Sequence, residues 1–305
     1  MKKDVFVIGS GIAGLTAGVY ALRCGLNVYL CDNAIVGGQI ATAPKIENYP
    51  AMFGVDGYEF SINLKNWFES NGGVINNERV ISVENIGNEF IVTTNKNSYT
   101  SKTVICANGA KRRKLGVVGE EEFTGKGISW CAQCDGMFYR GKKVAVIGGG
   151  NTAVGEALHL SELCSEVYLI LRRDEFSASK VMTDKLSEKK NINVIKSYRV
   201  NEFKGNEFLS SIELMSTKDG SSRNLDVSGV FEAIGADSDN SIFISLAEFD
   251  ENGFIITNKN CRTKTPGLYA AGDSRSQKYR QLVNAASDGC VAALEAYNYI
   301  AGIPY

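Results

Sequence analysis

Two cysteines, Cys131 and Cys134, are separated by two residues, and an acid, Asp135, directly follows the second one. A pair with this spacing serves either as half of a zinc site or as a reversible disulfide. A zinc site needs two more ligands, but the other cysteines form no second pair at ligand spacing, and the chain has a single histidine, His159. We therefore predict a redox-active disulfide and no metal site, with Asp135 placed to carry a proton to or from a leaving thiolate.

Composition and charge exclude several classes of function. The 305 residues include 33 basic and 34 acidic side chains, a net charge of -1 that predicts no nucleic-acid partner. The lone histidine argues against a catalytic triad. Asp4 and three early glycines interrupt the apolar stretch near the start, which argues against a signal segment, and no apolar run of about 18 residues predicts a membrane span. We expect a soluble, cytoplasmic protein.

The chain contains an internal repeat, and the two cysteines lie between its two copies. Residues 5–8 and 144–147 are apolar runs with strand character, and each leads into a glycine-rich turn, the two turns lying 139 residues apart. At the same offset the chain repeats a helical stretch and a second strand, predicted at 13–24 and 28–30 and again at 152–163 and 167–169. Both units therefore read as strand, glycine turn, helix, strand.

Each turn has the composition of a dinucleotide-binding site. The first glycine permits the tight turn, the second lets the backbone approach a pyrophosphate, and the third position must be small so that helix and strand can pack. The phosphates then lie on free N–H groups at the helix N-terminus. The predicted contacts are Gly9, Gly11 and Gly14 in the first unit, and Gly148, Gly150, Asn151, Thr152 and Ala153 in the second. Two copies in register predict two bound dinucleotides.

The ends of the second strands differ between the two units. Asp32 is placed to accept hydrogen bonds from a ribose 2′-hydroxyl, which suits FAD or NAD. Its equivalent is Leu171, followed by Arg172 and Arg173, a pattern that suits the 2′-phosphate of NADP. The alternative for the two arginines is an ordinary solvated surface.

The segment from Cys131 to Gly136, with residues 138–142, resembles the active-site segment of low-molecular-weight thioredoxin reductases, which are FAD-containing pyridine nucleotide-disulfide oxidoreductases. Residues 37–39 and 47–50 resemble that family's early flavin-contacting segments, residues 265–273 resemble its late FAD motif, and residues 279–293 resemble its closing helix. The resemblance spans essentially the whole chain. It adds these predicted cofactor contacts: Gly38, Gln39, Asn48, Gly272, Asp273, Arg280 and Gln281.

The resemblance implies an α/β fold with two Rossmann-like dinucleotide-binding domains, the second inserted into the first. The expected FAD-binding domain comprises residues 1–111 and 238–305, and the NAD(P)H-binding domain, residues 112–237, carries the cysteine pair. In such enzymes electrons pass from NADPH through FAD and the disulfide to thioredoxin. Cys134 would face the flavin, Cys131 would attack the partner, and the protein would be a homodimer.

Four departures from the family pattern stand out. The usual His-Arg-Arg-x-x-x-Arg of the second site is replaced by residues 171–177, in which Leu171 and Ser177 stand for the histidine and the last arginine. Asn108, Trp130 and Ala236 also replace residues that are usual in the family. The first departure leaves open NADH, ferredoxin or another electron donor, or oxidation of small dithiols. A flavin-binding redox sensor without turnover is a further alternative, which the intact cysteines and Asp135 disfavour.

Overall fold

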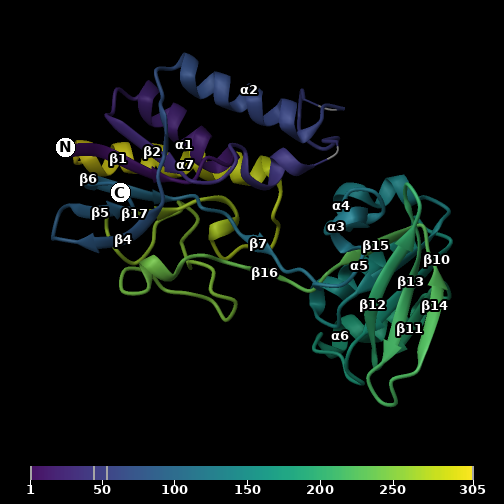
Figure 1. Cartoon of the computed structure of the whole chain (residues 1–305). Coiled ribbons are helices and arrows are strands. Elements are labelled where there is room, and N and C mark those ends of the chain that lie inside the picture. Colours follow the sequence, from purple (N-terminus) through teal and green to yellow (C-terminus); the bar gives the residue numbers. More distant parts are fainter. Residues whose placement is uncertain (1, 44, 53, 304–305) are drawn as a thin grey trace. The chain divides into compact units, whose positions relative to one another are not determined.

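The computed structural model describes residues 2–43, 45–52 and 54–303. The chain folds into two compact units, one formed by Met1–Lys111 and Asp237–Tyr305 and the other by Arg112–Ala236 (Figure 1). The second unit is therefore an insertion between two parts of the first. In the described residues no helix has both the length and the apolar character that crossing a bilayer requires.

The first unit is built on a largely parallel sheet. Its strand order is β3-β2-β1-β6-β5-β4, with β17 parallel to β6, while the β4–β5 and β5–β6 pairs are antiparallel. The strands are β1 (Lys2–Ile8), β2 (Val28–Asp32), β3 (Ile75–Asn77), β4 (Val80–Asn85), β5 (Phe90–Thr94), β6 (Ser98–Cys106) and β17 (Leu268–Ala270). Alternate residues of β1 enter opposite cores, with Val5 and Val7 on one face and Phe6 and Ile8 on the other.

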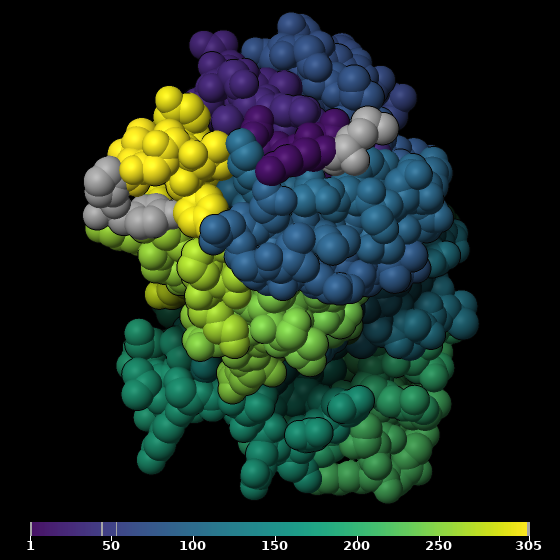
Figure 2. Space-filling model, turned by 90° about the vertical axis from the view of Figure 1, so that its left-hand side faces the viewer, coloured from purple at the N-terminus to yellow at the C-terminus, as the bar shows by residue number. Residues whose placement is uncertain are grey.

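Helices cover one face of this sheet. They are α1 (Ile12–Arg23), α2 (Gly57–Ser70) and α7 (Leu282–Ala301) (Figure 1). Helix α7 packs tightly on α1, since a Cβ at Gly289 would lie 2.1 Å from the carbonyl oxygen of Ala13. The other face is covered by the segment around η4 (Ser241–Phe243), which packs beside β4. Figure 2 shows this contact at the surface, where the blue β4–β5 region adjoins the yellow-green segment.

The second unit has a parallel sheet of order β11-β10-β9-β15-β8 and a smaller antiparallel sheet of order β12-β13-β14. Helix α5 (Asn151–Ser161) packs on one face of the parallel sheet, and the small sheet packs on the other. The strands are β8 (Ile128–Ser129), β9 (Lys143–Ile147), β10 (Glu166–Leu171), β11 (Ile192–Lys196), β12 (Tyr198–Gly205), β13 (Leu209–Ser216), β14 (Ser222–Asp226) and β15 (Gly229–Glu232). The short helices are α3 (Glu120–Phe123), α4 (Ala132–Asp135), η2 (Gly136–Tyr139), α6 (Lys180–Asp184) and η3 (Lys185–Glu188).

The repeated strand–turn–helix–strand elements that the sequence predicts are confirmed. Strands β1 and β9, helices α1 and α5, and strands β2 and β10 occupy the predicted segments to within a few residues at their ends. The two crossover segments, β7 (Lys111–Arg112) and β16 (Ala236–Asp237), form a two-stranded sheet. Within the first unit, Asn108 donates from Nδ2 to the carbonyl of Asp239 at 2.6 Å, so this unusual residue joins the outgoing and returning chain.

Candidate active site

The two cysteines form a disulfide at the start of a short helix. Cys131 is the N-cap of α4, and its Cα lies 5.3 Å from that of Cys134, which is in the last turn. The backbone N–H of Cys134 points at the Cys131 sulfur at 3.2 Å. Both residues are half-buried. One helical turn therefore brings two sulfurs together at a place that remains accessible to a reaction partner.

Asp135 is held beside the disulfide by Ser129. The Ser129 hydroxyl donates to Oδ2 of Asp135 at 2.5 Å and accepts the backbone N–H of Cys131 at 3.1 Å. The negative charge of Asp135 also reaches Tyr139, whose pKa is raised to about 12, mainly by burial. Ser129 is not among the residues predicted from sequence, where its one signal is its place two residues before Cys131. It orients the acid that is predicted to move a proton.

A second acid lies on the other side of the pair. Glu156 of α5 accepts the backbone N–H of Ala132, the residue after Cys131, at 3.4 Å, and its Oε2 is buried without a donor in the described residues. Burial raises the pKa of Glu156 to about 7, against smaller opposing effects of the Ala132 hydrogen bond and of Arg112. A carboxyl group in contact with the backbone between the two cysteines is therefore poised to change charge near neutral pH.

The first glycine turn contains two different kinds of glycine. Gly9 has φ +106°, and a Cβ on Gly14 would lie 1.9 Å from the carbonyl oxygen of Gly9, so both are required by packing. A Cβ on Gly11, the N-cap of α1, would meet no described atom closer than the Gly37 oxygen at 4.0 Å. The protein thus leaves the space at Gly11 open, as a bound pyrophosphate at this helix N-terminus requires.

The second turn repeats this arrangement. Gly148 has φ +144°, and its Cβ would approach the Ala233 oxygen at 2.5 Å and the Ala153 side chain at 3.0 Å. At Gly150, the N-cap of α5, the nearest described atom to a Cβ is the Ser177 hydroxyl at 3.7 Å. Both turns therefore fit a dinucleotide, with the same division between packing glycines and open glycines.

The second strand of each unit, β2 or β10, ends in a residue that differs between the two units. Asp32, at the end of β2, accepts the backbone N–H and the hydroxyl of Ser10 at 2.7 and 2.8 Å, which places its carboxylate beside the first turn. Leu171 takes this position in the second unit, where it is 1% exposed and lies against Gly149. Arg172 and Arg173 follow it with exposed side chains. An acid marks the first site, and an apolar residue with two cations marks the second.

Hydrogen bonds hold residues 177–179 against the second glycine turn. The backbone N–H groups of Ser177 and Ala178 donate to the carbonyl of Gly149 at 2.9 and 3.0 Å. Asn151 accepts the N–H of Ser179 through Oδ1 at 2.8 Å, and Thr152 follows it with an exposed side chain in the first turn of α5. Ser177 thus lies next to the predicted phosphate position, where the family pattern has an arginine.

The early and late segments predicted to contact FAD meet within the first unit. Asn48 donates to Oε1 of Gln281 at 3.2 Å, although 233 residues separate them. Gln39, which follows Gly38 (φ +60°), donates to the carbonyl of Ala110 at 2.6 Å. Asp273 accepts Gln277 at 3.5 Å, and the Arg280 guanidinium lies 4.0 Å from the ring centre of Phe254. The contact of Asn48 with Gln281, the N-cap of α7, thus joins an early and a late predicted segment.

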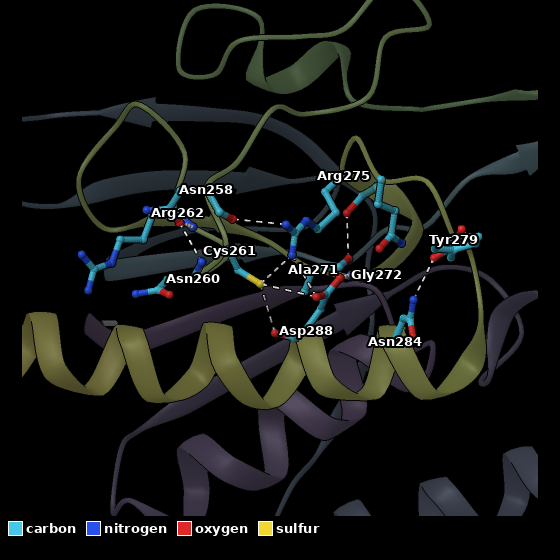
Figure 3. A network of polar contacts seen from close by, with 12 residues as sticks. Asn258, Asn260, Cys261, Arg262, Ala271, Gly272, Arg275, Tyr279, Asn284 and Asp288 are labelled. Carbon is cyan, nitrogen blue, oxygen red and sulfur yellow. Dashed lines mark hydrogen bonds and ion pairs between the residues drawn. The ribbon is translucent and has the colours of Figure 1, made fainter. Parts of the chain in front are cut away.

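A half-buried ion pair holds the Gly272 segment against α7 (Figure 3). Asp288 accepts the backbone N–H of Gly272 at 3.1 Å with one oxygen and Arg275 at 2.9 Å with the other. The same guanidinium donates to the Cys261 sulfur at 3.1 Å and to the carbonyl of Asn258 at 3.2 Å. Burial raises the pKa of Cys261 to about 12, so this sulfur is a neutral thiol at neutral pH.

The described residues contain no cluster of histidine, cysteine and acidic side chains able to hold a metal ion. Two glycine turns open at helix N-termini, together with an accessible disulfide in the same chain, define a nucleotide-dependent disulfide oxidoreductase.

Comparisons with known proteins identify the family. The model of the pyridine nucleotide-disulphide oxidoreductase family matches residues 3–289. A thioredoxin reductase of Treponema pallidum is 38% identical over 298 residues, which cover 97% of each chain, and one of Vibrio cholerae is 39% identical over 97% of this chain and 96% of that one. The crystal structure of a thioredoxin reductase from Streptococcus pyogenes is similar with a TM-score of 0.94, 35% identity and 99% coverage of both chains.

The chain belongs to the pyridine nucleotide-disulphide oxidoreductase family, within its thioredoxin reductase group. The family predicted from the motifs around Cys131 and the predicted α/β class with two Rossmann-like domains are thereby confirmed.

Substitutions at Gly11, which faces open space, and at Gly14, which packs on backbone, should have different effects. Gly11→Val should yield protein without the yellow flavin colour while the apoprotein loses about 1 kcal/mol or less, because its side chain enters open space. Gly14→Val should instead destabilise the apoprotein by about 3 kcal/mol or more, because its Cβ meets backbone. Absorbance near the flavin band and urea unfolding of each apoprotein measure the two effects. Full flavin content in Gly11→Val would show that the first turn is not the FAD site.

Glu156 generates a pH prediction. Its folded-state pKa is about 7, above the value of about 4.3 expected for an unfolded chain. The stability that the protonated Glu156 carboxyl group contributes to the folded protein is therefore fully present below the unfolded-state pKa of about 4.3. It is lost as the pH rises through the folded-state pKa of about 7. The stability advantage of Glu156→Gln over wild type should grow by about 3 kcal/mol between pH 4.5 and 8. Urea unfolding at several pH values measures this, with exposed Glu175→Gln as control, and a pH-independent difference contradicts it.

Proposed function

We infer that the protein is an FAD-dependent thioredoxin-disulfide reductase that takes its electrons from NADPH. The observation that carries this inference is the half-buried Cys131–Cys134 disulfide, with Asp135 hydrogen-bonded beside it, in the unit that contains the second dinucleotide turn. We assign FAD to the unit with Asp32 and NADPH to the unit with Arg172 and Arg173. FAD, when bound, supplies the two-electron chemistry that links the nucleotide to the disulfide.

The cysteines and Asp135 then perform the exchange with thioredoxin. Two electrons and one proton convert the disulfide into a thiol and a thiolate. The Cys131 thiolate attacks the partner's disulfide, which forms a mixed disulfide and releases a partner thiolate. Asp135 takes the proton from the Cys134 thiol and delivers it to that partner thiolate. The Cys134 thiolate then attacks Cys131, which restores the disulfide and releases the second partner thiolate. Ser129 supports this sequence because it holds the Asp135 carboxyl beside the cysteines.

The resemblance to the family also supports a cytoplasmic homodimer.

The identity of the electron donor depends on the second glycine turn. Arg172 and Arg173 provide two guanidiniums for a 2′-phosphate, and Leu171 adds no charge that would repel one. Ser177 lacks the third guanidinium of the family pattern. NADPH is therefore the proposed donor, with a weakened preference over NADH; ferredoxin or another reductant is the alternative if neither nucleotide reduces the flavin.

The two cysteines should have unequal roles. Cys131→Ser leaves Cys134 as a thiolate beside the flavin and should show a long-wavelength charge-transfer band, but should form no mixed disulfide with thioredoxin. Cys134→Ser should trap that mixed disulfide, because its resolving thiol is missing. Absorbance spectra and non-reducing electrophoresis distinguish the variants. Exchanged results would reverse the order of the cysteines, and full reductase activity in both variants would refute the proposed function.

The donor prediction rests on Ser177. A hydrogen bond to a charged group contributes about 1.5–3 kcal/mol, which corresponds to roughly 10- to 150-fold in affinity. Ser177→Arg should therefore lower the KM for NADPH about tenfold or more and leave the KM for NADH within about twofold. Ser187→Arg, which adds the same charge at an exposed position of the same unit, is the control. Equal changes for both nucleotides would show that residue 177 does not face the 2′-phosphate.

A further inference from the structure

Two acids of the second unit are buried although the proposed reaction does not use them. Glu120, in α3, and Glu232, the last residue of β15, are each 2% exposed. Acidic side chains are almost never buried to this degree without partners that compensate for the loss of water. One partner of these two acids, Trp130, directly precedes a cysteine of the redox disulfide.

Glu120 holds the loop that leads from the crossover into the second unit. Its carboxylate accepts the backbone N–H groups of Leu115, Gly116 and Val117 at 2.9, 2.6 and 3.4 Å. Three donors from the backbone stabilise the charged form of this carboxyl group. Glu120 is therefore the member of the pair whose negative charge is compensated.

Glu232 faces a different environment. Its Oε2 accepts the indole N–H of Trp130 at 3.0 Å, while its Oε1 is buried with no donor among the described residues. Burial, followed by the negative charge and the hydrogen bond of Glu120, raises the pKa of Glu232 to about 8, and Trp130 and Lys114 oppose the rise. Two carboxyl groups can hydrogen-bond to each other only through a proton. The hydrogen bond between Glu232 and Glu120 therefore requires one proton that the two carboxyl groups share.

Two cations and one apolar residue lie near this pair. Lys114 is engaged with Glu121 at 2.9 Å at the surface. The guanidinium of Arg112 lies over the Trp130 ring, 5.1 Å from its centre. On the neighbouring strand β9, the residue in register with Glu232 is the apolar Ile147.

Trp130 connects this pair to the active site, because it directly precedes Cys131. Its indole is held at the N–H by Glu232 and over its face by Arg112. The backbone that enters α4 therefore starts from a side chain fixed at two points. Ionisation of both carboxyl groups would place two negative charges in one buried site and weaken the contacts on either side of it.

We propose that Glu232 is a positioning residue for the redox disulfide. Through its hydrogen bond to Trp130, and through a proton shared with Glu120, it fixes the segment that leads into Cys131. The inference rests on the proposed function only in taking that disulfide as the reactive one.

The shared proton is tested through the indole signal of Trp130. The chain has two tryptophans, so Trp67→Phe leaves Trp130 as the single indole N–H resonance of the ¹⁵N-labelled, FAD-containing protein. This resonance should titrate with a midpoint near pH 8. The titration should vanish in Glu232→Gln, whose amide donates to Glu120 while its carbonyl accepts the indole, and should persist in the exposed control Glu122→Gln. No titration between pH 6 and 10, or the same titration in Glu232→Gln, would overturn the shared proton.

The positioning role is tested through the reactivity of Cys131. After reduction with dithionite, alkylation of Cys131 by iodoacetamide at pH 7 is followed by peptide mass spectrometry. Glu232→Leu and Trp130→Phe should each raise the rate about threefold or more, and the double variant should exceed neither, because both break one interaction. Glu232→Gln should react at the wild-type rate. Wild-type rates in Trp130→Phe would refute the role even if Glu232→Leu failed to fold.

Neither measurement uses a nucleotide or thioredoxin. A protein that reduces thioredoxin but lacks both effects would contradict this inference alone. A protein that shows both effects without reductase activity would support the inference and refute the proposed function.

Discussion

The close approach of a helix to the strand that precedes it is the constraint on which both units depend. At Gly14 a single methyl group would lie 1.9 Å from the Gly9 carbonyl oxygen, and at Gly148 it would lie 3.0 Å from the Ala153 side chain of α5. This approach aims the first N–H groups of α1 and α5 at open space, where no side chain caps them. Because those groups are left for a ligand, the same packing that stabilises each unit also creates its phosphate site.

In the first unit, other segments also pack closely against helix α1, which carries the phosphate site at its N-terminus. The Cβ position of Gly289 on α7 falls 2.1 Å from the Ala13 carbonyl, and that of Gly272 falls 2.9 Å from the Ala13 side chain. The ion pair of Asp288 with Arg275 then ties the Gly272 segment to α7. Small residues allow the approach, and a half-buried ion pair with further hydrogen bonds fixes its geometry.

The repeated elements could be predicted from sequence because their signals are local. A strand of apolar residues, glycines at turn positions and a small residue at Gly14 or Ala153 all act within a few residues of one another. The contact of Asn48 with Gln281, by contrast, joins residues 233 positions apart, and no local pattern encodes it. Resemblance to a family with a known fold was needed to place such residues in one site.

Three polar residues near the disulfide could not be predicted from the sequence for a related reason. Ser129 ends β8, Glu156 lies within α5, and Glu232 ends β15, so their meeting depends on the register of the parallel sheet and the packing of α5 on it. Each reads as an ordinary polar residue until that register is known. Trp130 illustrates the same point, because its departure from the family pattern gains meaning only from the carboxyl group opposite its N–H.

The protonation of these acids also matters for the electrostatics of reduction. Reducing the disulfide adds negative charge to the sulfurs, and a carboxylate beside them would raise the free energy of the thiolate. Glu156 contacts the backbone between the two cysteines, and burial raises its pKa to about 7. Near and below that pH a large share of Glu156 is neutral, so it does not repel the thiolate that must attack the partner. In the proposed exchange Asp135, which accepts a hydrogen bond from Ser129, is the group that carries the proton.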